Sequence, residues 1–298
     1  MDPLTHLKNE VSRLFIERRK SLGYKGALLQ FFNDLINKRS IYIVASILTP
    51  VTLFFASRYA TTVSSLIIIS FALTATILVA IVALALLSRV RGFAFIYFLI
   101  PVSYLVLGVL FSLYFFPNLG YLIKMASFIG LGFVVYALSL VNNIFVVVEE
   151  KQSVIPLYSA GLAWVQIILI LIAIPFYSGI YKVPANFVVQ NILLFFSTFS
   201  FYIYMHWAVN LDKDLIKTPL KEKGSLAFVL SLLPVVLNTG LLFYPVEAFL
   251  KGIFSSTVLL SGLIYIQAHY KNRINSKLLY NYFVLGSIFY IILFIFKP

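Results

Sequence analysis

Long apolar runs alternate with short charged loops along most of the chain. Nine runs of 17 to 28 residues contain no Asp, Glu, Lys or Arg. An α-helix needs about 20 apolar residues to cross the roughly 30 Å of hydrocarbon in a bilayer. We therefore expect nine transmembrane segments, at residues 40–57, 61–88, 93–116, 125–148, 153–180, 185–209, 226–244, 252–268 and 278–296.

The runs have the pattern of helices rather than of barrel strands. A segment inside a bilayer must satisfy its backbone hydrogen bonds within the protein, which leaves helices and closed barrels. Barrel strands are about 10 residues long and alternate in polarity, whereas a run such as 66–87 shows no alternation. The composition agrees, with 11% charged residues against about 25% in soluble domains. The sequence predicts an all-α integral membrane protein.

Lys and Arg residues are distributed unevenly between the two sides of this arrangement. With the N-terminus in the cytoplasm, 18 of the 23 lie on the cytoplasmic side. Cytoplasmic loops carry an excess of Lys and Arg. We therefore predict a multi-pass protein of the cytoplasmic membrane, with the N-terminus inside and the C-terminus outside. Residues 244–251 fit either a tight outer turn or a re-entrant segment, so the count of spans around them stays open.

The net charge of +13 is interpreted with this topology. Nine of the ten acidic residues also fall on the cytoplasmic side, which leaves a net charge of +9 there. Each basic residue beside an anionic leaflet contributes about 1 kcal/mol of attraction. Nucleic-acid binding needs a folded basic domain, and the longest hydrophilic segment is residues 1–39. We expect membrane lipids as partners and no nucleic acid, and protein partners stay open.

The first 39 residues form the predicted cytoplasmic domain, and residues 40–298 the transmembrane domain. Asp2 and Pro3 resemble an N-cap and a first helical turn. Apolar residues then recur at helical spacing among basic ones through residue 22, as Leu4, Leu7, Val11, Leu14, Phe15 and Leu22. This pattern is typical of an amphipathic helix in the headgroup layer of the inner leaflet. The alternative is a docking site for a protein partner.

Neutral polar side chains within the runs are the candidates for a binding site. An ionisable residue inside a membrane would be a functional candidate by default, but no run carries one near its middle. The candidates for a substrate cavity are Asn142, Asn143, Gln166, Asn191, Pro234 and Asn238. Either the amides line one polar cavity, or they form hydrogen bonds between helices. Pro234 favours a broken helix of the kind that lines transporter sites, although Pro is common in membrane helices.

No pattern in the sequence indicates a catalytic residue, a metal site or a cofactor. His206 precedes Asp212 and Asp214 by about two turns or less, and a His with two carboxylates is able to bind a divalent cation. The acids, however, alternate with Lys213 and Lys217, which is the pattern of a solvated loop of mixed charge. We interpret His206 as part of an interfacial aromatic belt.

Residues 142–161 read NNIFVVVEEKQSVIPLYSAG. This stretch resembles a segment of uncharacterised multi-spanning membrane proteins of bacteria with reduced genomes. The resemblance implies a multi-pass membrane fold, and the proteins that it points to have no assigned function. The leading hypothesis from the residues is a permease-like or lipid-handling protein. The alternatives are a non-catalytic membrane scaffold or assembly partner and, third, a lipid-modifying membrane enzyme.

The predicted topology is testable by labelling, because the chain has no native Cys. Single Cys residues at positions 217 and 271 should react with an impermeant reagent from the cytoplasmic side only. Cys at positions 182 and 298 should react from the outside only, because the bias in Lys and Arg places them there. Labelling of positions 182 and 217 from the same side would contradict the nine-span arrangement.

Overall fold

The structure is a computed structural model that describes residues 38–57, 62, 64, 65, 67, 69, 94–115, 118, 120–151, 155–212, 215, 218–241 and 246–295. The chain divides into two compact units, Met1–Val44 and Ala45–Pro298. Of the first unit, only residues 38–44 are described. The predicted amphipathic helix at residues 4–22 and most of the run 61–88 lie outside the described residues.

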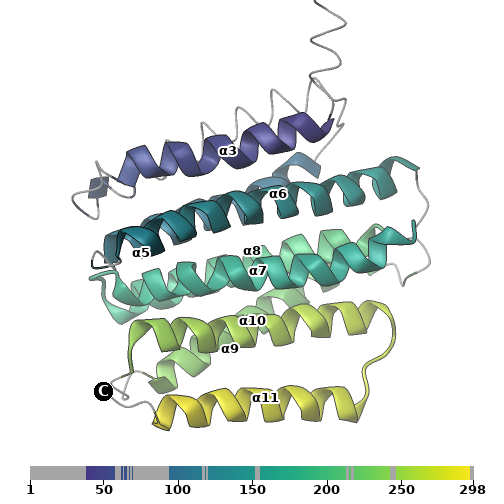
Figure 1. The fold of residues 1–298 in the computed structure, drawn as a ribbon. Coiled ribbons are helices and arrows are strands. Elements are labelled where there is room, and N and C mark those ends of the chain that lie inside the picture. Colours follow the sequence, from purple (N-terminus) through teal and green to yellow (C-terminus); the bar gives the residue numbers. More distant parts are fainter. Residues whose placement is uncertain are drawn as a thin grey trace, which may run out of the picture. The chain divides into compact units, whose positions relative to one another are not determined.

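Every regular element in the described ranges is an α-helix, which confirms the all-α prediction. Each of these helices overlaps one predicted run, with ends that differ from those of the run by up to six residues. They are α3 (Lys38–Ser57), α5 (Ala94–Phe115), α6 (Tyr121–Lys151), α7 (Leu157–Lys182), α8 (Phe187–Asn210), α9 (Leu220–Leu241), α10 (Ala248–Tyr270) and α11 (Ser276–Ile295). Within the second unit, α5 to α11 run side by side as a helical bundle (Figure 1).

The helices α5 to α10 contain six segments long and apolar enough to cross a membrane. The apolar part of α3 is the shorter stretch Tyr42–Phe55. These segments identify a multi-pass membrane protein. The described residues support six candidate spans, and the total of nine stays a prediction.

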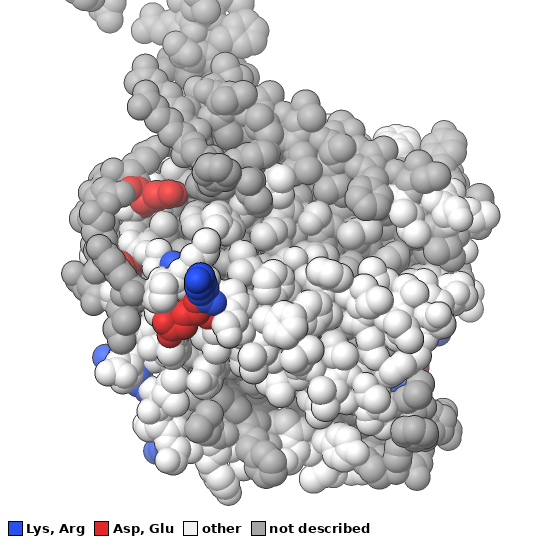
Figure 2. All heavy atoms as spheres, turned by 180° about the vertical axis from the view of Figure 1, so that it is seen from behind, with Lys and Arg blue, Asp and Glu red and all other residues white. Residues whose placement is uncertain are grey.

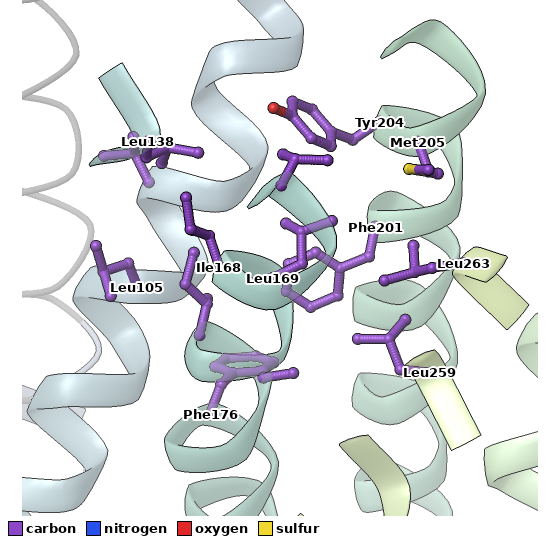
Figure 3. Close-up of a cluster of buried hydrophobic side chains, with 14 of the residues drawn as sticks. Leu105, Leu138, Ile168, Leu169, Phe176, Phe201, Tyr204, Met205, Leu259 and Leu263 are labelled. Carbon is purple, nitrogen blue, oxygen red and sulfur yellow. The ribbon is translucent and has the colours of Figure 1, made fainter. Parts of the chain in front are cut away.

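Helix α7 lies at the centre of the bundle, in contact with α5, α6, α8 and α10. Its side chains Val165, Leu169 and Ile172 are completely buried. Figure 3 shows how the surrounding helices contribute to the same core, through Leu105, Leu138, Phe201, Met205, Leu259 and Leu263. Because lipid tails are as apolar as these side chains, the core is held by close packing rather than by exclusion of water.

Small residues bring the backbones of these helices together. A Cβ added to Gly252 of α10 would lie 2.8 Å from the backbone N of Ser178 in α7. A Cβ added to Gly108 of α5 would lie 3.0 Å from the backbone N of Phe176, also in α7. Glycine permits such an approach because it has no side chain. The packing of α7 against both neighbours therefore depends on these two positions.

The chain ends α10 with a left-handed residue, Asn272, whose φ is 50°. The backbone N of Arg273 donates to Ala268 O at 2.9 Å, and the N of Asn272 donates to His269 O at 3.1 Å. This pair of bonds is a Schellman motif, in which Asn is tolerated at the left-handed position. It fixes the last turn of α10, which carries His269 and Tyr270.

We predict that Gly252→Ala lowers the free energy of unfolding by about 1 to 3 kcal/mol, because the methyl group would overlap the Ser178 backbone and separate α7 from α10. Unfolding in mixed detergent micelles measures the change. The control is Gly130→Ala in α6, where an added Cβ meets no described atom within 4 Å. That control should be neutral or slightly stabilising. Equal effects of the two substitutions would contradict the packing argument.

Candidate functional site

The amides predicted from the sequence lie between pairs of helices. Asn142 of α6 is buried, and its Oδ1 accepts a hydrogen bond of 2.6 Å from the Tyr204 hydroxyl of α8. Asn238 of α9 donates through Nδ2 to Asn191 Oδ1 of α8 at 2.7 Å. Each bond joins two different helices, α6 to α8 and α8 to α9.

A third amide contact joins α7 to α10. Gln166 Nε2 donates to Gln267 Oε1 at 2.9 Å. The sequence identified Gln166 but not its partner Gln267. Gln267 lies near the end of the eighth run, about one turn before the charged loop that follows, where a polar residue is not conspicuous. Asn143 is half-buried on the turn that carries Asn142. Four of the candidates, Asn142, Gln166, Asn191 and Asn238, thus take part in three separate interhelical hydrogen bonds, and a cavity shared by the candidates stays a prediction.

Helix α9 runs through Pro234 from Leu220 to Leu241 without leaving the helical conformation. Pro234 is buried within this helix. The described part of the seventh run is therefore one continuous helix, and a substrate contact at Pro234 stays a prediction.

Tyrosine hydroxyls supply interhelical bonds that sequence reasoning missed. Tyr158 at the start of α7 donates to Ala208 O in the last turn of α8 at 2.7 Å. The hydroxyls of Tyr177 and Thr198 are hydrogen bonded at 2.9 Å, and those of Tyr181 and Ser255 at 2.6 Å. Buried Tyr hydroxyls usually find a partner. The sequence shows that the chain contains 19 tyrosines, but it does not indicate the partner of each.

A polar cluster lies where α8 and α10 end and α9 begins. His206 of α8 is only 3% exposed, and its Nδ1 is 3.1 Å from the Tyr270 hydroxyl. Thr218 Oγ1, just before α9, donates to that same hydroxyl at 2.8 Å. Glu222 in the first turn of α9 lies 3.2 Å from His269 Nε2. His206 is thus a buried side chain rather than a member of an exposed interfacial belt.

Only one of the two acids near His206, Asp212, lies in the described part of the chain. Asp214 lies outside the described residues. The part of the chain that is described contains no group of three or more His, Cys, Asp or Glu side chains able to hold a metal ion.

An apolar groove of about 560 Å³ lies between the second half of α3 and the first turns of α6. Its walls are Ser46, Ile47, Pro50, Val51, Phe54 and Phe55 of α3, and Met125, Phe128, Ile129 and Gly132 of α6. The two helices touch at both ends of it. A Cβ on Gly132 would lie 2.7 Å from Ser46 O, and the rings of Phe54 and Phe128 pack edge to face at 5.5 Å.

Comparison with known proteins adds no identity, since no family model, curated protein or solved structure matches this chain. Function must therefore be argued from the arrangement of the residues.

We predict that Asn191→Leu and Asn238→Leu each lower the stability of the protein, because either one leaves the other amide without its partner. The double substitution should lose less than the sum, with a coupling energy of about 0.6 to 2 kcal/mol. Equilibrium unfolding in micelles measures the cycle. Thr239→Val is the control, since its exposed hydroxyl donates to Val235 O within the same helix. Strictly additive losses would show that the two amides act separately, as lining of a cavity would require.

Proposed function

We propose that this protein is a lipid-handling membrane protein that holds an acyl chain of a phospholipid in the groove between α3 and α6. The observation that carries the proposal is the groove itself, whose lining contains Ser46 as its one polar side chain among ten residues. Its volume of about 560 Å³ falls within the roughly 300 to 1,000 Å³ of small-molecule sites.

The exposure of the lining supports a lipid rather than a water-soluble ligand. Ile129 is 75% exposed, and Ile47 and Phe55 are also exposed. Ile129 lies in α6, which is long and apolar enough to span the membrane, and an exposed apolar side chain there faces hydrocarbon. A groove with apolar walls in that position has nothing to offer an ion or a sugar, whereas an acyl chain fills it by dispersion contacts alone.

The polar side chains favour this reading over a permease. A permease needs polar groups that are available to its cargo. Asn142, Gln166, Asn191 and Asn238 are instead hydrogen bonded to side chains of other helices. These bonds would have to break before the same amides could bind a substrate, which makes the permease the second candidate.

The proposal includes the full topology predicted from the sequence: nine spans, the N-terminus in the cytoplasm, and residues 1–39 on the anionic inner leaflet. Among the described residues, most charged side chains on one face gather toward the left of Figure 2, with few at its right edge and an uncharged band between them. The α10–α11 connection, with Lys271 and Arg273, lies at the charged end (Figures 1 and 2). This supports a cytoplasmic location for that end, and the groove then lies in the outer half of the membrane.

Native mass spectrometry of the full chain tests the groove. The wild-type protein should retain a phospholipid after exchange into mild detergent. Ile129→Trp should lose it, because the indole fills the groove. Phe133→Trp, one turn further along α6 and 68% exposed, lies outside the lining and should retain it.

Two outcomes would overturn the proposal. If the wild-type protein retains no phospholipid, the groove does not hold a lipid and the scaffold hypothesis takes its place. If Ile129→Trp and Phe133→Trp retain the lipid equally, the lipid binds elsewhere.

A further inference from the structure

The groove between α3 and α6 extends toward the start of α6. Gly132 of α6 lies against Ser46 of α3, where an added Cβ would be 2.7 Å from the Ser46 carbonyl oxygen. One turn closer to the start of α6, Phe128 packs against Phe54, which lies two turns further along α3. The two helices are therefore antiparallel along the groove, and Met125 is the lining residue nearest to the start of α6.

Lys124 lies just beyond this end of the groove. It is the fourth residue of α6 and precedes Phe128 by four positions, so the two residues share a face of the helix. The residues before it in α6, Tyr121, Leu122 and Ile123, are exposed, whereas Lys124 is half-buried. Part of the Lys124 side chain therefore packs against the protein, on the face that Phe128 also occupies.

The charge of Lys124 is not neutralised within the described part of the chain, where Lys124 pairs with no carboxylate. The predicted topology places five basic residues on this side of the membrane against one acid, Glu247. Glu247 directly precedes α10. A Lys near the end of a membrane helix extends its ammonium group into the headgroup layer. An anion from outside the chain is thus the available partner for this ammonium group.

We propose that Lys124 selects an anionic phospholipid for the groove, with its ammonium group against the lipid phosphate while an acyl chain lies between α3 and α6. The inference rests on the acyl-chain site proposed above. Phosphatidylglycerol carries its phosphate without a compensating cation and is attracted to Lys124. Phosphatidylcholine presents the same phosphate together with a quaternary ammonium group, which cancels the net charge. Lys124 therefore determines the headgroup, whereas the apolar lining retains the acyl chain.

Competition between two lipids that differ only in the headgroup tests this inference. The full chain in mild detergent is incubated with equal amounts of phosphatidylglycerol and phosphatidylcholine that carry identical acyl chains. Native mass spectrometry then measures the ratio of the two bound lipids. The wild-type protein should favour phosphatidylglycerol about fivefold, the effect of one basic residue beside an anionic headgroup. Lys124→Gln should bring the ratio close to one without lowering the total bound lipid, and Lys124→Arg should keep the preference.

Lys251→Gln is the matched control. Lys251 is the fourth residue of α10 and is half-buried, as Lys124 is in α6, whereas the described lining residues of the groove belong to α3 and α6. This variant should keep the wild-type ratio. Equal changes in Lys124→Gln and Lys251→Gln would show that net charge alone sets the ratio, and would overturn the inference.

Ile129→Trp separates the selection by Lys124 from the acyl-chain site itself. If this variant loses both lipids while the wild-type protein binds the two equally, the groove holds lipid and only the role of Lys124 is refuted. If Ile129→Trp retains both lipids, they bind elsewhere, so the acyl-chain site fails and the selection by Lys124 fails with it.

Discussion

The need to satisfy polar groups without water governs the described bundle. Inside the bilayer a side-chain amide or hydroxyl has only other protein groups as partners. The bundle meets this constraint with pairs that join different helices, such as Asn142 with Tyr204 and Asn191 with Asn238. Each pair requires one particular partner residue at the same depth in the bundle. The polar residues therefore help to determine which helices approach each other, which apolar packing alone would not do.

The sequence predicted the helices well because hydrophobicity and length are local properties. The ends of α5, α7 and α8 lie within a few residues of the runs from which they were predicted. It predicted the role of the amides less well. Gln166 is conspicuous in an apolar run, but its partner Gln267 is 101 residues away, and no local pattern connects the two. The sequence thus identifies residues that need partners, whereas only the fold supplies them.

The position of His206 within its helix also limited what the sequence could predict about its environment. Near the end of the sixth run, next to Trp207, it has the pattern of an interfacial residue. Its burial depends on Tyr270 and Thr218, which come from the end of α10 and from the segment before α9. The Schellman motif at Asn272 holds the first of these in place. The residues around position 206 give no local indication of such long-range contacts.

The approach of Gly252 to Ser178 has a mechanical consequence. Two helices whose backbones touch cannot slide past each other, because each side chain along the seam is locked between neighbours. Helices α7 and α10 therefore behave as one rigid unit in the middle of the bundle. Any motion that accompanies binding is therefore expected in helices that meet this pair without such a backbone contact.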